Sequence, residues 1–191
     1  AGASFHHDTA AVELMLDDNG RVCGVHALTP AGFARFQARA VVLACGGFEA
    51  NAEMRARYLG PGWDMVKVRG VPFNTGDGLR MALAIGAMPH GSWTTCHAAP
   101  QDIELPVYTT PSRFAVEGND WVRYMYYIAV MVNRNGERFV DEGSDTRGKT
   151  YAKMGRAILA QPGGIAFQIM DAKIRKMNLY SMHYRKATTA K

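Results

Sequence analysis

Two glycine-rich segments of this chain, residues 44–47 and 74–77, have the residue types needed to hold a bulky ligand against bare backbone. The first ends a short apolar run and the second opens a helical pattern. Glycine permits a sharp turn and close approach of a ligand, and a helix start offers N–H groups. A Gly-Gly turn by itself is more often only a tight turn, but the second segment favours a cofactor site. The predicted cofactor-binding residues are Ala44, Cys45, Gly46, Gly47, Asn74, Thr75, Gly76 and Asp77.

Three polar side chains are candidates for contact with a substrate. Arg147 carries a guanidinium that stays protonated at ordinary pH and can hold a carboxylate through two parallel N–H bonds. His97 stands in a segment rich in Pro and Thr, where a single histidine is more often a structural donor than a ligand. Arg123 stands within an aromatic run, so a core position and a pocket position both remain open.

Periodicity predicts the elements that position the two glycine-rich segments. Residues 40–44 are continuously apolar, which is typical of a strand buried on both faces. Asn51 has the residue type of an N-cap for the helix predicted over AEMRARYL. Thr75 has the same type before a second helical pattern, which ends at Gly86.

Turn signals divide the rest of the first half of the chain. Asp18-Asn19-Gly20 and the turn at residues 29–32 predict a β-meander over the first forty residues. Residues 60–73 contain Gly and Pro breaks and are predicted to be a loop or short crossover. Residues 88–91 resemble a hinge, and residues 93–116 lack periodicity and are predicted to be an ordered loop.

The second half of the chain alternates strand and helix signals. The aromatic and β-branched run at residues 121–132 predicts a strand, which a turn at residues 134–136 folds back into a hairpin. Three further elements are predicted downstream: a helix over 151–160, a strand over 165–170 and a helix that Asp171 begins.

Composition excludes several classes of protein. The 191 residues carry a net charge of +5, but Lys and Arg are spread through the chain, which favours a solvated face or a pocket for small anions over nucleic acid. The three cysteines are scattered, which favours a reducing, cytoplasmic compartment. His6 and His7 have no partner at ligand spacing, so we expect no metal site. No run is long and apolar enough for a transmembrane helix.

The segment VVLACGGFEAN, followed by NTGDGLRMALAIGA, resembles the flavoprotein family of fumarate reductases and succinate dehydrogenases. Cys45 replaces the Thr that this family usually carries. The resemblance implies FAD as cofactor and a mixed fold, α+β and α/β. Because the sequence has no G-x-G-x-x-G motif, we expect an internal fragment of a two-dinucleotide-fold flavoprotein. Residues 1–88 would be a partial FAD-binding domain with a β-meander, and residues 89–191 a truncated substrate-capping domain.

The same resemblance implies catalytic roles. VNRNGERFVDEGSDTRGK is similar to the family segment whose arginine exchanges a proton with the substrate carbon, which implies that role for Arg147. The stretch CHAAP stands where the family places a histidine that binds a substrate carboxylate, which implies that role for His97. The family's Thr-Glu pair is missing, and Arg123 stands in its place, which favours a substrate with an additional negative charge.

Within this family the chain most resembles the FAD-dependent tricarballylate dehydrogenases. That resemblance implies oxidation of tricarballylate to cis-aconitate, with hydride transfer to flavin N5 and electrons passed to a membrane-bound iron–sulfur partner at the inner face of the membrane. Two alternatives remain open. One is a flavoprotein of the precorrin-3B synthase type, acting in corrin chemistry or electron relay. The other is a non-catalytic piece that forms homodimers and purifies without FAD.

Overall fold

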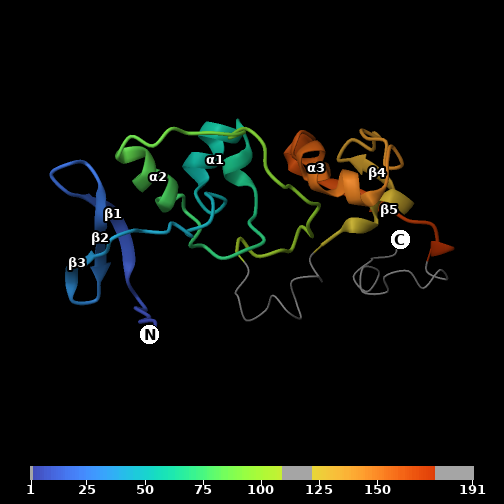
Figure 1. The fold of residues 1–191 in the computed structure, drawn as a ribbon. Coiled ribbons are helices and arrows are strands. Elements are labelled where there is room, and N and C mark those ends of the chain that lie inside the picture. Colours follow the sequence, from blue (N-terminus) through green and yellow to red (C-terminus); the bar gives the residue numbers. More distant parts are fainter. Residues whose placement is uncertain (1, 109–121, 175–191) are drawn as a thin grey trace. The chain divides into compact units, whose positions relative to one another are not determined.

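The computed structural model describes residues 2–108 and 122–174. The chain divides into two compact units. Figure 1 shows the path of the chain through them, coloured by sequence. Unit 1 comprises Ala1–Met54 and Phe73–Ser92, and unit 2 comprises Arg55–Pro72 and Trp93–Lys191. Both glycine-rich segments belong to unit 1, whereas His97, Arg123 and Arg147 belong to unit 2. The domain boundary proposed from the sequence after residue 88 stays a prediction.

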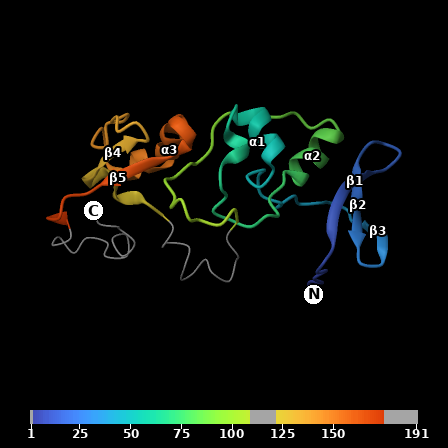
Figure 2. The ribbon, with the colours of Figure 1, turned by 180° about the vertical axis from the view of Figure 1, so that it is seen from behind.

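Unit 1 begins with the predicted β-meander. Strands β1 (Ala10–Leu16), β2 (Val22–Thr29) and β3 (Gly32–Gln37) form an antiparallel sheet in that order, seen from both sides in Figures 1 and 2. Gly20 makes the first turn at a φ of 74°, where its N–H donates to the carbonyl of Asp17. The second turn joins Thr29 to its pairing partner Gly32. Both predicted turns are therefore confirmed.

Residues 40–44 do not form the buried strand that their composition predicts. They lie in no strand, and Val42 is 89% exposed. Leu43 is 38% exposed. A strand buried on both faces needs hydrogen-bonded neighbours and a covering layer on each side, and the part of the chain that the structure describes places no strand beside this run. The prediction of a buried strand is wrong for this structure.

The predicted helices after the glycine-rich segments are both present. Helix α1 (Ala52–Leu59) begins at Asn51, whose Oδ1 accepts the N–H of Met54 at 3.1 Å, so the predicted N-cap is confirmed. Helix α2 (Asp77–Ala84) has Gly76 as its N-cap, so the prediction that Thr75 caps it is wrong. The hydroxyl of Thr75 donates instead to the carboxylate of Asp77. Between these helices lies the short 3-10 helix η1 (Trp63–Met65), within the predicted loop.

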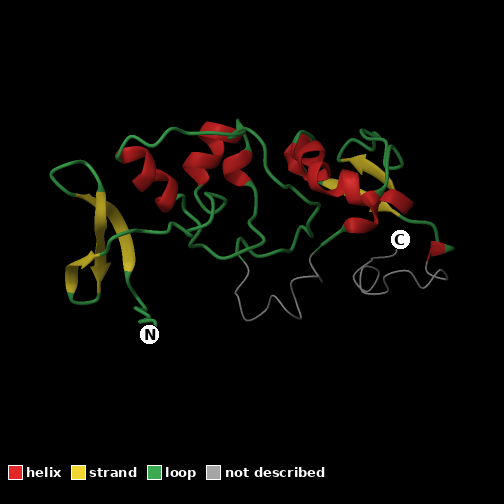
Figure 3. Ribbon diagram, viewed as in Figure 1, coloured by secondary structure: helices red, strands yellow, loops and turns green. Residues whose placement is uncertain are grey.

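Unit 2 contains η3 (Tyr124–Ile128), β4 (Val130–Asn133), α3 (Arg147–Leu159), η4 (Pro162–Gly164) and β5 (Ala166–Ile169). Strand β4 pairs with β5 in antiparallel fashion, although the sequence predicts that β4 pairs with residues 137–140. That predicted hairpin is reduced to a turn and one isolated bridge, Val132 to Arg138. Figure 3 distinguishes these helices and strands from the loops around them.

The strand predicted over residues 121–132 is confirmed only from Val130 onward, and Trp121 lies outside the described residues. The segment before it is the 3-10 helix η3 because the adjacent side chains of Met125 and Tyr126 are both buried. A strand directs neighbouring side chains to opposite faces, so a helical turn suits this pair better. Tyr126, Met131 and Met154 form the apolar core here.

The last predicted elements meet with mixed outcomes. Helix α3 begins four positions before the predicted start and ends one position before the predicted end. Strand β5 is confirmed within the predicted range. Asp171 accepts the N–H of Lys173 through its side chain, as a helix cap does, but the helix predicted to follow lies largely outside the described residues.

Candidate functional site

In unit 1 the two glycine-rich segments lie against each other, as a shared cofactor site requires. The N–H of Gly76 donates to the carbonyl of Gly47 at 3.0 Å, and the N–H of Ala50 donates to the carbonyl of Asn74 at 2.9 Å. The side chain of Asn51 adds a third link, to the carbonyl of Thr75 at 2.9 Å. We call these two segments, residues 44–51 and 74–78, the glycine cradle.

Glycine is required where the two halves of the cradle meet. Gly46 and Gly76 have φ angles of 72° and 84°, which other residues rarely adopt. A Cβ on Gly76 would lie 2.5 Å from Sδ of Met54. A Cβ on Gly78 would lie 3.0 Å from Cβ of Cys45, so Cys45 packs directly over the start of α2. The sequence requirement for these glycines therefore includes packing between the segments.

The charges of the cradle indicate which part of a dinucleotide it suits. Glu49 accepts the amide of Asn74 at 2.6 Å, and Asp77 accepts the hydroxyl of Thr75. Two carboxylates repel a pyrophosphate but accept hydrogen bonds from hydroxyl groups. Gly76 provides no side-chain cap, so the first turn of α2 keeps N–H groups available for a ligand acceptor. The residues fit a neutral, hydroxyl-bearing part of FAD.

In unit 2 a series of ring contacts links His97 to Arg147. The rings of His97 and Tyr151 meet edge to face with centroids 4.9 Å apart. Tyr151 meets Tyr124 in the same manner at 5.3 Å. Cζ of Arg147 lies 5.4 Å from the ring centroid of Tyr124. We call His97, Tyr151, Tyr124 and Arg147 the aromatic ladder.

The loop that carries His97 is fixed to the middle of α3 by backbone hydrogen bonds. The N–H of Ala98 donates to the carbonyl of Ala152 at 2.7 Å, and the N–H of Gly155 donates to the carbonyl of Ala98 at 2.7 Å. This approach requires glycine, because a Cβ on Gly155 would lie 2.5 Å from the Ala98 oxygen. The sequence analysis missed this contact, although a glycine inside a helical pattern is a signal of close backbone approach.

Arg147 stands at the first position of α3, and Thr146 is the N-cap without a side-chain hydrogen bond. A cation at the positive end of a helix dipole is unfavourable by itself. An anion bound there interacts favourably with both the guanidinium and the N–H groups of the first turn. The position of Arg147 therefore suits a carboxylate of a substrate.

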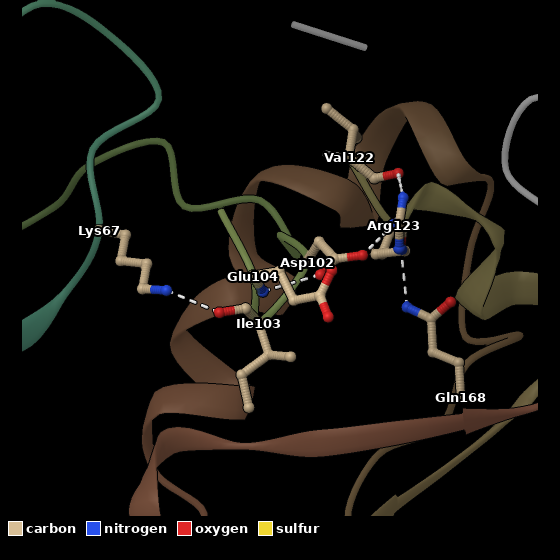
Figure 4. Close-up of polar contacts among 7 residues, drawn as sticks. All are labelled: Lys67, Asp102, Ile103, Glu104, Val122, Arg123 and Gln168. Atoms are coloured by element: carbon tan, nitrogen blue, oxygen red, sulfur yellow. Dashed lines mark hydrogen bonds and ion pairs between the residues drawn. The ribbon is translucent and has the colours of Figure 1, made fainter. Parts of the chain in front are cut away.

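The third predicted substrate residue, Arg123, forms an ion pair with Asp102 that the sequence did not suggest (Figure 4). The two side chains are 18% and 13% exposed. The carbonyl of Arg123 accepts the side-chain amide of Gln168 at 2.8 Å, which ties this position to β5. Because Asp102 offsets the charge of Arg123, the pair does not provide the uncompensated positive charge that would favour a substrate with an additional negative charge. A role for Arg123 in substrate binding stays a prediction.

A buried carboxylate organises the loop that leads to Arg147, and the sequence analysis assigned it no role. Glu142 accepts the N–H of Met131 at 2.5 Å and two N–H groups of Arg138, at 2.5 and 3.0 Å. Burial raises the pKa of Glu142, but the bonds from Arg138 and from Met131 outweigh burial and lower it below its ordinary value. The charged form of Glu142 therefore holds β4 and the turn before α3 together.

Within residues 2–108 and 122–174, no group of three or more His, Cys, Asp or Glu side chains is arranged to hold a metal ion. None of the helices there is both long enough and apolar enough to span a membrane.

Comparison with known proteins agrees with the geometry of the cradle. Residues 1–177 match the family described as FAD binding domain. The chain is 35% identical over 178 residues to a probable fumarate reductase, Ifc3, of Shewanella frigidimarina, which is 92% of this chain and 27% of that protein. The chain thus spans about a quarter of the length of the curated relatives that it matches first.

Solved structures give the same result. The open conformation of a flavocytochrome c3 fumarate reductase matches 88% of this chain and 27% of its own, with a TM-score of 0.64 and 30% identity. A 3-ketosteroid delta1-dehydrogenase from Sterolibacterium denitrificans, in complex with 1,4-androstadiene-3,17-dione, matches 87% of this chain and 29% of its own, with a TM-score of 0.66 and 27% identity. The chain therefore belongs to the FAD binding domain family, with FAD as its cofactor, and its relatives are fumarate reductase flavoproteins and related FAD-dependent oxidoreductases.

Proposed function

We propose that the protein carrying this chain interconverts a single and a double carbon–carbon bond beside a carboxylate of a small polycarboxylate. The specific reaction proposed is the oxidation of tricarballylate to cis-aconitate. The relatives support the coarser class, because their names combine the reduction of fumarate with the dehydrogenation of a ketosteroid. In each of these named substrates the reacting bond lies next to a carbonyl group.

The proposal assigns one task to each substrate residue of unit 2. His97, on the loop fixed to α3, binds a substrate carboxylate by a charge-assisted hydrogen bond. Arg147, at the start of α3, accepts or returns the proton at the neighbouring carbon. Since a guanidinium loses a proton only transiently, Arg147 needs neighbours that favour proton passage, and its guanidinium lies over the ring of Tyr124.

FAD, when bound, supplies the two-electron acceptor for this chemistry. The glycine cradle would hold a hydroxyl-bearing part of FAD through Glu49, Asp77 and the first turn of α2. The remaining electron acceptor that we propose is an iron–sulfur partner protein at a membrane. Positioning of the substrate by His97 and Arg147 would contribute much of the rate acceleration.

One observation carries the proposal. His97 and Arg147 are far apart in the sequence, yet the aromatic ladder joins them through three successive contacts, as complementary roles on one substrate require. Both ends of the ladder carry groups that bind carboxylates, whereas Arg123 is balanced by Asp102. We therefore assign the substrate carboxylates first to His97 and Arg147.

The test uses Arg147→Lys and His97→Ala in the FAD-loaded protein. Arg147→Lys should lose most turnover, by about 100-fold or more, because a shorter point charge misplaces the proton. His97→Ala should mainly raise KM, by a factor that corresponds to about 1–3 kcal/mol. Steady-state rates should be measured for tricarballylate, succinate and fumarate.

Arg156→Lys is the matched control. Arg156 also belongs to α3 and also lies over an aromatic ring, that of Trp63 at 5.4 Å, but it stands far along the helix from Arg147. Its replacement should leave turnover within about twofold. Near-normal activity of Arg147→Lys would exclude the proton-transfer role, and the absence of activity on all three acids would redirect the search to corrin substrates.

A further inference from the structure

The two tyrosines of the aromatic ladder have no role in the function proposed above beyond their proximity. Tyr151 and Arg147 both belong to α3 and stand one turn apart, on the same face of the helix. Tyr124 comes from η3 and contacts both of them: its ring meets that of Tyr151 in a T-shaped arrangement, and the guanidinium of Arg147 lies over its face. Tyr124 therefore contacts both residues, and the guanidinium of Arg147 packs on its ring.

A buried hydrogen bond between η3 and α3 holds Tyr124 in this position. The hydroxyl of Tyr126, in the same 3-10 helix as Tyr124, lies 2.5 Å from Oγ1 of Thr150 on α3, and both residues are fully buried. Burial raises the pKa of Tyr126 above its ordinary value despite the opposing effect of Thr150, so its phenol stays protonated at neutral pH and the bond persists. The position of η3 on α3 is thereby fixed, and the position of Tyr124 with it.

The other end of the ladder is fixed in a similar way. The hydrogen bonds of Ala98 to Ala152 and Gly155 hold the loop on α3, and His97 directly precedes Ala98. Tyr151 stands next to Ala152 and meets the ring of His97. Helix α3 thus serves as a common base for both substrate-binding groups, and the two tyrosine rings fill the interval between them.

Packing in the apolar core explains only part of the arrangement. The core beside α3 consists of Tyr126, Met131 and Met154, which are buried, and Tyr151 packs against it. Tyr124, Tyr151 and Arg147 are only partly buried, and His97 is exposed. The ladder is thus a surface feature whose two ends carry an imidazole and a guanidinium, and these are groups that bind anions.

We propose that Tyr124 and Tyr151 are positioning residues, which hold Arg147 and His97 at the separation that a single carboxylate substrate can span. The inference rests on the proposed function and deepens it, because a fixed separation selects substrates by the distance between the reacting carbon and the bound carboxylate. The edge-to-face and cation–π contacts depend on the rings. The hydroxyl groups of Tyr124 and Tyr151 are not needed for this role.

The experiment compares ring removal with hydroxyl removal in the FAD-loaded protein, with tricarballylate as the substrate and an oxidised dye as electron acceptor. Tyr124→Leu should lower kcat by about 10–100-fold and leave KM within about threefold, because it releases Arg147. Tyr151→Leu should raise KM by at least about tenfold, because it removes the ring that contacts both His97 and Tyr124 and so releases His97. Tyr124→Phe and Tyr151→Phe keep the rings and should both stay within about threefold of wild type.

Tyr58→Leu is the matched control, since Tyr58 makes a similar ring contact with Trp93, at 4.9 Å, away from the ladder. Flavin absorbance and Tm report folding, and where a leucine variant fails to fold, the methionine variant at that position is judged by the same criteria. Leucine variants that behave like Tyr58→Leu, or phenylalanine variants as impaired as the leucine ones, overturn the positioning role. Should Arg147→Lys and His97→Ala also be fully active, the proposed function itself fails; if those two are impaired, only the present inference does.

Discussion

At the scale of single residues, Glu142 shows how a charge inside the fold supports the site from a distance. Its carboxylate is 3% exposed and joins the N–H of Met131 on β4 to the guanidinium of Arg138. The side chain of Arg138 is itself 57% exposed, so only the Glu142 side of this ion pair is shielded from solvent. Removal of the buried charge leaves its partners with weaker bonds, whereas the exposed charges nearby matter little.

Glu142→Gln should therefore lower the free energy of unfolding at pH 7 by about 1–3 kcal/mol, since glutamine keeps an acceptor for Met131 but loses the charge. The folded-state pKa of Glu142 is lowered, so its stabilisation is complete at neutral pH and is lost as the pH falls through that pKa. Urea unfolding of wild type and variant should differ most near pH 7 and converge as the pH falls through the folded-state pKa of Glu142.

The control for this prediction is Asp141→Asn. Asp141 lies 3.9 Å from the same guanidinium, but its side chain is 71% exposed. Its replacement should change the free energy of unfolding by less than about 0.5 kcal/mol at any of these pH values. An equal effect of the two variants would show that total charge, and not the buried bond, accounts for the stabilisation.

At the scale of elements, α3 determines where the substrate residues lie, and its two glycines offer a direct test. In an ordinary helix, Gly→Ala stabilises by about 0.5–1 kcal/mol. Gly148→Ala should follow this rule, because a Cβ there meets nothing within 4 Å. Gly155→Ala should instead destabilise by about 1–3 kcal/mol, because its Cβ would meet the Ala98 carbonyl.

The same pair of variants separates stability from function. Displacement of Ala98 moves the loop that carries His97, so Gly155→Ala should also raise KM for tricarballylate, whereas Gly148→Ala should leave it unchanged. Thermal unfolding and steady-state kinetics on the two proteins provide the comparison. A stabilised Gly155→Ala protein with normal KM would mean that the loop does not rest on α3.

At the scale of the whole molecule, the cofactor site is the feature to test. The cradle suits a neutral part of FAD, and the sequence has no G-x-G-x-x-G motif to hold the pyrophosphate. We therefore expect the 191-residue chain, purified alone, to retain much less than one equivalent of FAD. Visible flavin absorbance relative to protein concentration measures this directly, and a value near one equivalent contradicts the prediction.

Local signals in the sequence determined the turns and the helix ends, because these features depend on neighbouring residues. The turns at Gly20 and at residues 29–32, the N-cap at Asn51 and the end of α2 at Ala84, two residues before Gly86, each follow from the conformational preferences of a few adjacent residues. The motifs around residues 44–47 and 74–77 also identified the family, because those glycines meet a packing requirement that few other residues satisfy.

Tertiary structure alone decided which segments meet. Residues 40–44 have the composition of a buried strand, yet burial depends on partners that a composition cannot name. Strand β4 pairs with β5, and Arg123 pairs with Asp102, through contacts between segments that no local pattern relates. The aromatic ladder arose in the same way, since the rings of His97, Tyr151 and Tyr124 come together only once α3, η3 and the loop at Ala98 have packed. The residue type determines the interactions that each side chain can make, and long-range packing determines which partners it makes them with.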